Sequence, residues 1–191
     1  MNAAIVGGMK KPHLVFRGKV FSVSRDLTVE PGGVRVVREI VRHPGSVVVI
    51  PQDAQGRLLL IRQYRYAARR KMWEVVAGRI DAGEKPLQAA RRELAEEAGL
   101  GARSWTRLGR FYPSPGFMDE IMWLYLARNL YSASAPGDPD ERISKRWFRP
   151  ARVGRMIRRG LLWDSKSALC YFLLQDRGRS EERRVGKECR L

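Results

Sequence analysis

Apolar and polar residues alternate along the N-terminal part of the chain, residues 13–42. Turn residues interrupt the alternation at Arg17-Gly18 and at Pro31-Gly32-Gly33. A period of two is typical of strands that bury one face, and glycine and proline are typical of the tight turns between them. We therefore predict a small N-terminal antiparallel sheet.

Two stronger apolar runs follow, at residues 46–51 and 58–63, and a turn at residues 53–56 separates them. Runs rich in β-branched residues are typical of buried strands. The simplest interpretation is a buried hairpin within a central sheet. Further strands are predicted at residues 72–77, 105–111, 120–127 and 143–148.

Helical spacing replaces alternation at residues 86–98, where Leu87, Ala90, Leu94 and Ala98 form one apolar stripe. Proline suits the first turn of this helix, and Gly99 suits the left-handed residue just past its end. Two further helices are predicted, at residues 151–159 and from Asp164, as N-cap, to residue 175. The order of elements indicates a mixed α/β (α+β) fold whose mixed central sheet follows the small antiparallel sheet.

Three glutamates, Glu93, Glu96 and Glu97, stand at positions i, i+3 and i+4 of the first predicted helix, on the side we expect to lie opposite the apolar stripe. Like charges at this spacing destabilise a helix by roughly 0.2–0.5 kcal/mol per pair, so a cation is expected between them. Mg²⁺ is typically held by one or two carboxylates together with phosphate oxygens. The alternative is a solvated acidic face whose charges are paired with nearby arginines.

Length and composition limit the class of protein. A chain of 191 residues with 44% hydrophobic and 30% charged residues is sufficient for one folded core. It contains no apolar run long enough to span a bilayer and no secretory signal pattern, so we expect a cytoplasmic protein and no membrane partner. Two cysteines, Cys170 and Cys189, cannot form a disulfide framework or a zinc site.

The formal charge of +17 is typical of proteins that bind polyanions. The arginines are spread along the whole chain, however, and only eight of the 37 basic residues are lysine. This pattern favours a general compositional bias and an attraction for small phosphate compounds over a nucleic-acid partner. Residues 179–189 resemble a translated sequencing adapter, so we treat residues 179–191 as non-native; without their five basic and three acidic residues the charge is +15.

One segment carries a specific motif, G-x5-E-x7-R-E-L-x-E-E-x-G-L. Its fixed positions are Gly78, Glu84, Arg92, Glu93, Leu94, Glu96, Glu97, Gly99 and Leu100. The motif resembles the signature of the Nudix hydrolases, and the resemblance extends over about residues 13–175. It implies an α/β/α sandwich fold and hydrolysis of a diphosphate bond with divalent cations.

Within this family the chain resembles the branch that hydrolyses ADP-ribose and other nucleoside-diphosphate sugars. The passages that carry this resemblance are His43-Pro44-Gly45, Arg62-Gln63-Tyr64-Arg65, Trp73-Glu74, Ser114-Pro115-Gly116 and Asp119-Glu120. Pro115 follows Gly99 by sixteen residues, which is the placement associated with the ADP-ribose group.

The resemblance also implies roles for individual residues. The metal ligands, for Mg²⁺ with Mn²⁺ as a substitute, would be Glu93, Glu96, Glu97 and the backbone carbonyl of Ala77. Arg92 would brace the glutamates, and Glu84 would shape the loop before the helix. Glu96 and Glu97 would take part in catalysis, and Glu141, with Asp140 as second choice, would be the general base on a loop after the motif.

Substrate contacts are implied for Arg65, Glu74, Phe21, Glu120 and Pro115. Arg65 would contact the diphosphate, with a surface ion pair as the alternative, and Glu74 and Glu120 would contact substrate, the dimer partner or a salt-bridge partner. Phe21 or Phe16 would stack on the adenine, with simple core packing as the alternative. The resemblance further implies a homodimer with exchanged N-terminal strands, with residues 1–43 serving dimerisation and substrate completion and residues 44–178 forming the hydrolase domain.

Three hypotheses follow. The first is an Mg²⁺-dependent hydrolase that converts ADP-ribose, a small-molecule nucleotide sugar, to AMP and ribose 5-phosphate. The second keeps this chemistry but changes the substrate to another sugar nucleotide or a dinucleotide. The third is a non-catalytic module that binds nucleotides or nucleic acid, and it predicts dispensable glutamates and steeply salt-dependent binding.

Overall fold

The computed structural model describes residues 12–136 and 142–188, and of residues 179–188 the backbone alone. These residues form two compact units. Unit 1 contains residues 12–45 and 111–122, and unit 2 contains the remainder.

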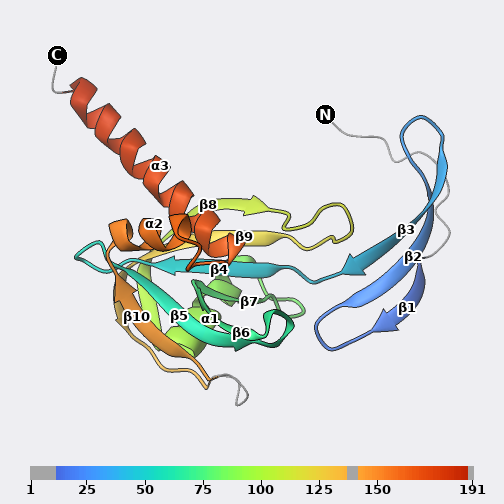
Figure 1. The fold of residues 1–191 in the computed structure, drawn as a ribbon, viewed down its shortest axis with the longest axis horizontal. Helices are drawn as coiled ribbons and strands as arrows, with labels where there is room; N and C mark the ends of the chain where they lie inside the picture. The colour runs from blue at the N-terminus through green and yellow to red at the C-terminus, as the bar shows by residue number, and fades with distance from the viewer. Residues whose placement is uncertain (1–11, 137–141, 189–191) are drawn as a thin grey trace. The chain divides into compact units, whose positions relative to one another are not determined.

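Unit 1 is built on a three-stranded antiparallel sheet in the order β1-β2-β3 (Figure 1). Its strands are β1 (His13–Arg17), β2 (Ser22–Val29) and β3 (Arg35–Arg42). The turn between β2 and β3 contains Gly32 and Gly33, whose φ values are 93° and 84°. Residues with a side chain rarely adopt such positive φ values, so glycine is favoured at both positions. The small antiparallel sheet that the alternation predicted is confirmed.

The segment of residues 111–122 belongs to this unit because it bonds to the end of β3. The N–H of Val41 donates to the carbonyl of Phe117 at 2.8 Å, and the N–H of Asp119 donates back to the carbonyl of Val41 at 3.1 Å. The carboxylate of Asp119 then accepts from the N–H of His43 at 2.9 Å and from Nη1 of Arg42 at 3.0 Å. Asp119 therefore fixes the chain where it leaves the sheet.

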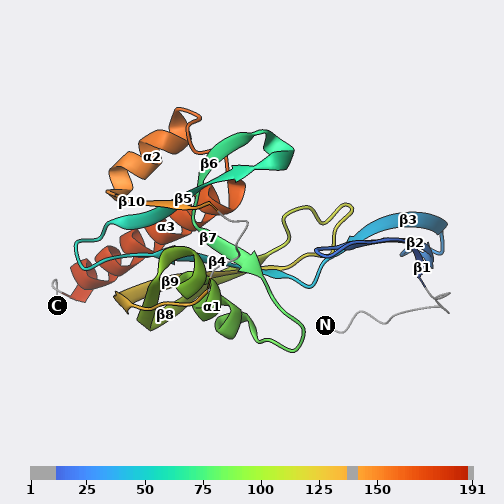
Figure 2. The ribbon, with the colours of Figure 1, turned by 90° about the horizontal axis from the view of Figure 1, so that it is seen from below.

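Unit 2 contains two sheets and three helices (Figures 1 and 2). The four-stranded sheet has the order β7-β4-β9-β8, from β4 (Ser46–Pro51), β7 (Val76–Arg79), β8 (Leu100–Phe111) and β9 (Met122–Ser132). The three-stranded sheet has the order β10-β5-β6, from β5 (Leu58–Arg65), β6 (Arg70–Glu74) and β10 (Ser144–Phe148), with the 3-10 turn η1 (Tyr66–Ala68) joining β5 to β6. The helices are α1 (Pro86–Ala98), α2 (Pro150–Arg158) and α3 (Ser165–Glu188).

The core of unit 2 lies around β4, where Val47, Val48 and Val49 are completely buried. Helix α1 packs on β4 and β7, with Ala90 and Leu94 buried against the sheet, and α3 also contacts β4. The mixed α/β class, with a mixed central sheet and a separate small antiparallel sheet, is thus confirmed.

Two details of the predicted strands are wrong. The runs that form β4 and β5 are joined by the predicted turn and by one antiparallel bridge, Gln52 with Leu58, but they do not pair further as a buried hairpin. Strand β5 lies between β10 and β6, while β4 lies in the other sheet next to β7. The single strand expected at residues 72–77 is two strands of different sheets. The chain changes sheets at Val75, whose N–H donates to Oγ of Ser167 at 2.8 Å instead of to a neighbouring strand.

Helix α1 and the start of α3 follow the local signals in the sequence. Helix α1 spans the predicted residues, and Asp164 caps α3 by accepting from the N–H of Ser167 at 3.0 Å. Helix α3 continues past the expected end at residue 175 to Glu188, through a sequence rich in the helix formers Arg, Glu and Lys. Among the described residues, no helix is both long and apolar enough to cross a bilayer.

Candidate active site

Helix α1 carries two of the three motif glutamates on its buried side. Glu93 and Glu97 are only 9% and 6% exposed. The expectation that the acids lie opposite the apolar stripe is wrong for Glu93 and Glu97, because at about 100° per residue Glu97 stands close to Leu94 and Glu93 follows on its flank. It holds for Glu96, whose side chain is 24% exposed. The alternative interpretation, a solvated acidic face paired with arginines, is also wrong for Glu93 and Glu97, because both are buried.

Gly78 on β7 makes this placement possible. A Cβ atom at Gly78 would lie 1.9 Å from Cδ of Glu93 and 2.0 Å from its Oε1. No side chain fits at such distances, so the carboxylate of Glu93 occupies the space that a side chain on β7 would fill. The glycine of the motif thus leaves room for the Glu93 carboxylate against β7.

Arg92 joins three carboxylates of the motif. Its guanidinium donates to Glu84 through Nε at 3.1 Å and Nη2 at 2.9 Å, and through Nη1 to Glu93 at 2.6 Å and to Glu96 at 3.0 Å. Nη2 also donates to the carbonyl of Arg79 at 2.9 Å. The two-pronged bond to Glu84 is the main reason why the pKa of Arg92 is raised and why the pKa of Glu84 is held below its ordinary value.

Glu97 is fixed from the other side, by the strand. The N–H of Ala77 donates to its Oε2 at 3.0 Å. The two buried glutamates are thereby oriented by different partners, Arg92 for Glu93 and the backbone of β7 for Glu97. Both carboxylates are held at the seam between α1 and β7.

This set of donors fits a hard divalent cation. Glu93 and Glu96 already share one cationic atom, Nη1 of Arg92, so their carboxylates converge on a common point. Over residues 12–136 and 142–188, no group of three or more His, Cys, Asp or Glu side chains is arranged to hold a metal by itself. Magnesium takes only one or two protein carboxylates beside water and substrate oxygens, so a closed protein cage is not its usual site.

Arg65 and Glu74 form a second polar cluster in unit 2. Glu74 is 1% exposed and accepts from Nε and Nη2 of Arg65, each at 2.8 Å, and from Nζ of Lys166 at 2.6 Å. Burial alone would raise the pKa of Glu74, but the hydrogen bond from Arg65 and the charge and hydrogen bond of Lys166 outweigh it, so the pKa is lowered. The pKa of Arg65 is raised, first by its hydrogen bond to Glu74 and in smaller part by the charge of Glu97, so this cluster lies within electrostatic reach of the motif glutamates.

The remaining predicted contacts lie in unit 1 or outside the described residues. Phe16 and Phe21 are 51% and 43% exposed, with ring centroids 5.8 Å apart, so they are not core aromatics. Oε1 of Glu120 lies 3.8 Å from Nδ1 of His43, and Pro115 is exposed in a turn closed by the bond from the N–H of Met118 to the carbonyl of Ser114 at 3.0 Å. Glu141 and Asp140 lie outside the described residues.

Comparison with known proteins settles the family. The NUDIX domain model matches residues 42–169. The chain belongs to the Nudix family. An ADP-ribose pyrophosphatase of Mycobacterium tuberculosis is 38% identical over 151 residues, covering 78% of this chain and 73% of that protein, and one of Bacillus subtilis is 38% identical over 127 residues, covering 66% and 69%.

The fold comparison agrees. The crystal structure of an ADP compounds hydrolase superposes with a TM-score of 0.76 at 26% identity, over 93% of this chain and 100% of that one. This Nudix protein is therefore a pyrophosphohydrolase, and the motif at the seam of α1 and β7 is its family signature. Nudix hydrolases generally use a divalent metal ion.

Lys166 was not found from the sequence, although it shares the buried carboxylate of Glu74. The two residues are 92 positions apart, and no local pattern connects them. The cap residue Asp164 was the one available signal, because it places Lys166 in the first turn of α3 and itself accepts from Lys166 Nζ at 2.7 Å.

Proposed function

We propose that this Nudix hydrolase uses Mg²⁺, or Mn²⁺ in its place, to hydrolyse ADP-ribose to AMP and ribose 5-phosphate. The observation that carries the proposal is the seam of α1 and β7, where two buried glutamates and a half-buried third are held in place. The substrate is suggested by the relatives from Mycobacterium tuberculosis and Bacillus subtilis, both named ADP-ribose pyrophosphatase.

The metal would be held by the carboxylates of Glu93, Glu96 and Glu97 and by the backbone carbonyl of Ala77. When bound, a divalent ion supplies charge neutralisation at the diphosphate and makes water a better nucleophile at neutral pH. Arg92 holds Glu93 and Glu96 in position through one oxygen of each carboxylate. The N–H of Ala77 holds Glu97 through its Oε2.

Arg65 would bind the diphosphate. Its Nε and Nη2 are committed to Glu74, but the side chain is 40% exposed and its guanidinium has a further edge with donors. The buried Glu74 fixes this edge in one orientation, and planar guanidinium groups match phosphate oxygens in geometry. Glu74 is in this proposal a positioning residue for Arg65.

The proton of the attacking water would pass to a carboxylate that acts as general base, and Glu141 is the first candidate for this role. Glu96 and Glu97 would take part in catalysis from within the glutamate cluster. The nucleophile is water, the bond that breaks joins a phosphorus atom to the bridging oxygen, and the leaving group is a phosphate monoester. A carboxylate near the water needs only to accept its proton as the new P–O bond forms.

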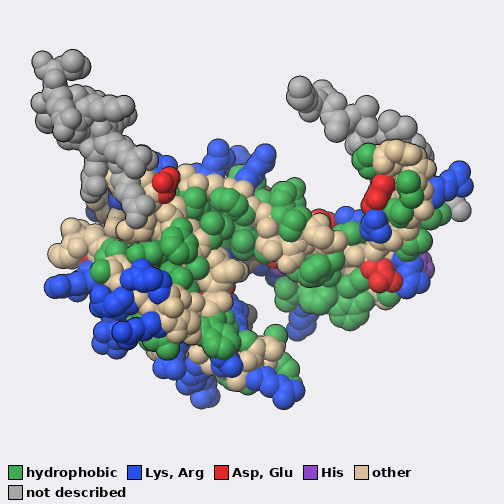
Figure 3. Space-filling model, turned by 45° about the horizontal axis from the view of Figure 1, so that its top comes forward, with side chains coloured by type: hydrophobic (Ala, Val, Ile, Leu, Met, Phe, Trp, Pro, Cys, Tyr) green, Lys and Arg blue, Asp and Glu red, His purple; other side chains and the backbone are tan. Residues whose placement is uncertain are grey.

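A homodimer with exchanged N-terminal strands completes the proposal, with Phe21, Glu120 and Pro115 binding the nucleotide end. Its support is the exposed apolar surface of the sheet of unit 1, seen at the right of Figure 3. The exposed apolar side chains on the strands and in the turn between β1 and β2 are Leu14, Val15, Phe16, Val20, Phe21, Leu27, Val29 and Val37, and Val34 in the turn between β2 and β3 is exposed as well. Apolar patches of this kind mark protein interfaces more often than solvent-facing surface.

A substrate panel tests the proposed function. ADP-ribose, other sugar nucleotides and dinucleotides are incubated with the protein in Mg²⁺, Mn²⁺ or EDTA, and the products are separated by chromatography. We expect AMP and ribose 5-phosphate in the highest yield from ADP-ribose, no turnover in EDTA, and loss of turnover in Glu97→Gln with an unchanged circular dichroism spectrum. The matched control is Glu39→Gln, whose side chain is 63% exposed on unit 1.

Each outcome of the panel has a defined meaning. A higher kcat/KM for another ADP compound would show that this compound, and not ADP-ribose, is the preferred substrate of the same reaction. Such a result would agree with the ADP compounds hydrolase that shares the fold. Full turnover by Glu97→Gln would overturn the proposed role of the glutamate cluster.

A further inference from the structure

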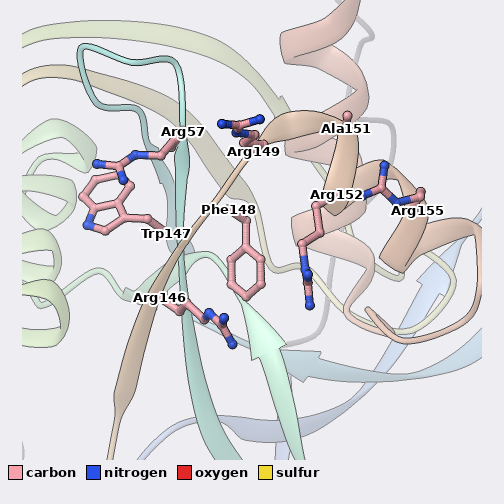
Figure 4. A pocket seen from close by; sticks show the side chains of 8 residues that line it. All are labelled: Arg57, Arg146, Trp147, Phe148, Arg149, Ala151, Arg152 and Arg155. Atoms are coloured by element: carbon pink, nitrogen blue, oxygen red, sulfur yellow. The ribbon is translucent and has the colours of Figure 1, made fainter.

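A hollow of about 490 Å³ lies in unit 2 where β10 leads into α2 (Figure 4). Five of its eight lining residues are arginines and none is acidic; the lining is Arg57, Arg146, Trp147, Phe148, Arg149, Ala151, Arg152 and Arg155. A concentration of guanidinium groups around one concave volume needs a physical explanation, because like charges repel one another there.

Aromatic rings support these arginines without neutralising them. The guanidinium carbons of Arg146 and Arg152 lie 5.6 and 5.8 Å from the ring centroid of Phe148, and Figure 4 shows the two side chains flanking that ring. Arg57 lies over Trp147 at 5.8 Å. Cation–π contacts of this kind hold the guanidinium groups in place and leave their positive charge available to a ligand.

Four of the five charges have no acidic partner among the described residues. Arg57 forms an ion pair with Asp53 at 2.6 Å, whereas none of Arg146, Arg149, Arg152 and Arg155 lies within 4.0 Å of a described carboxylate. A smaller hollow, lined by Arg152, Arg155 and Arg159 together with Met156 and Leu161, continues the positive surface. Figure 3 shows Lys and Arg side chains gathered at the left of unit 2.

We propose that this hollow is a second anion site, which binds two or more linked phosphates of a small ligand such as a nucleoside triphosphate or an inorganic polyphosphate. Planar guanidinium forks match phosphate oxygens, and several forks around one volume match several linked phosphates. A volume of 490 Å³ lies in the range of small-molecule sites, about 300–1,000 Å³.

The hollow is separate from the proposed catalytic site. None of its lining residues belongs to the family motif or to the Arg65–Glu74 cluster. Figure 2 shows α2 and α1 on opposite sides of the sheets of unit 2. A ligand in the hollow would therefore be an additional ligand of the protein and not the substrate at the motif glutamates.

Calorimetric titration in EDTA tests the site without turnover. Inorganic tripolyphosphate and ATP are titrated into the full chain, into Arg146→Gln/Arg152→Gln, and into Arg149→Gln/Arg155→Gln, which spares both arginines on Phe148. The control is Arg103→Gln/Arg107→Gln, which removes the same charge from arginines that also lie over rings, Tyr131 and Trp123, but do not line the hollow.

We expect each hollow variant to weaken tripolyphosphate binding at least tenfold and the control to change it less than twofold. Glu97→Gln, which removes a motif carboxylate, should bind tripolyphosphate like the wild type, so the result is independent of the proposed catalytic function. Equal tripolyphosphate and ATP affinities would show that the phosphates suffice, and tighter ATP binding that is still lost in the hollow variants would show a nucleotide ligand.

Two results would overturn the proposal. They are the absence of measurable tripolyphosphate binding and an equal loss of tripolyphosphate binding in the hollow variants and the control. The second result would show that the general positive charge of the chain attracts polyanions without a defined site.

Discussion

Gly78 and Glu93 occupy one space between them: the position that a Cβ atom of residue 78 would take lies 1.9 Å from the carboxyl carbon of Glu93. The carboxylate of Glu93 on α1 therefore lies directly against the backbone of β7. The bare backbone of Gly78 thus determines where a motif carboxylate lies, although residue 78 contributes no chemical group of its own.

Gly78→Ala should therefore damage catalysis more than it damages the fold. The added methyl group displaces the Glu93 carboxylate from its contact with Arg92, and overpacking of this kind costs about 1–3 kcal/mol. A displacement near 1 Å at a catalytic group lowers turnover by roughly 100-fold. The measurements are steady-state kcat in Mg²⁺ and thermal unfolding.

The control for this substitution is Gly178→Ala on α3, where an added Cβ would meet no atom within 4 Å and the φ angle is not strained. It should leave kcat unchanged and raise stability by up to about 1 kcal/mol, because glycine is a poor helix former. Wild-type turnover in Gly78→Ala would show that the position of Glu93 does not limit the reaction.

Arg92→Ala should destabilise the protein and make its stability depend on divalent cations. The substitution leaves Glu84, Glu93 and Glu96 without their shared guanidinium, and with the side chain of Arg92 28% exposed we expect a loss of about 1–3 kcal/mol. Millimolar Mg²⁺ should then raise the unfolding temperature of the variant more than that of the wild type. Arg92→Lys keeps the charge but loses the planar fork. Its stability and the rise of its unfolding temperature in Mg²⁺ should therefore lie between those of the wild type and Arg92→Ala.

Denaturation in guanidinium chloride would mask this effect by ionic screening, so urea is the suitable denaturant. An unfolding temperature of Arg92→Ala that Mg²⁺ does not raise beyond the wild-type shift would contradict the view that a cation can replace the guanidinium among these carboxylates.

The helix that carries the site was predictable because its signals are local. Pro86 and Gly99 mark its two ends, and Arg92 reaches Glu93 and Glu96 within the same helix. Periodicity also separated strand from helix along the chain. The helical spacing could not show, however, whether a glutamate on the flank of the apolar stripe is buried. Its burial depends on the absence of a side chain at Gly78, which lies on β7.

Contacts between distant segments were beyond a local pattern. The two runs that form β4 and β5 looked like a hairpin because hydrophobicity specifies burial but not the strand beside which a residue lies. The hydroxyl of Ser167 accepts the N–H of Val75 from 92 residues away, and this bond marks the change of sheet that splits the predicted strand. The burial of Glu74 beside Lys166 arises from the same long-range packing.

Glu74→Gln should give a pH-dependent loss of stability. The buried carboxylate neutralises Arg65 and Lys166, so at pH 7 its removal should cost about 2–4 kcal/mol. The folded-state pKa of Glu74 lies below the ordinary value of 4.5, so its contribution is full above pH 4.5 and is lost as the pH falls through the folded pKa. The difference between wild type and variant should therefore be largest near pH 7 and shrink below pH 4.5.

Urea unfolding at pH 7, 5, 4 and 3 measures this difference, with Glu39→Gln as the exposed control that should stay within about 0.5 kcal/mol of the wild type. A constant difference at every pH would show that Glu74 acts through its shape and hydrogen bonds and not through its charge.

Glu96→Gln and Glu97→Gln should differ in their effects. Glu97 is 6% exposed and accepts a hydrogen bond from the N–H of Ala77, whereas the side chain of Glu96 is 24% exposed and accepts one from Arg92. We expect kcat to fall at least 100-fold in Glu97→Gln and less in Glu96→Gln, since a more solvated carboxylate is more easily replaced by water. The Mg²⁺ concentration at half-maximal rate should rise in both variants, and a larger loss in Glu96→Gln would reverse the proposed order of the two ligands.

Val37→Glu should convert the proposed homodimer to a monomer. Val37 on β3 is 54% exposed and pairs across the sheet with Leu27 on β2, which is 47% exposed, so the pair presents an apolar surface. A buried unpaired charge is costly at an interface, whereas the same glutamate costs little on a free surface. Val34→Glu is the matched control, because Val34 is 58% exposed but lies in the turn between the two strands.

Sedimentation equilibrium should give the mass of two chains for the wild type and Val34→Glu and of one chain for Val37→Glu. A wild-type protein that sediments as one chain, or a Val37→Glu variant that stays dimeric, would contradict an interface on this sheet.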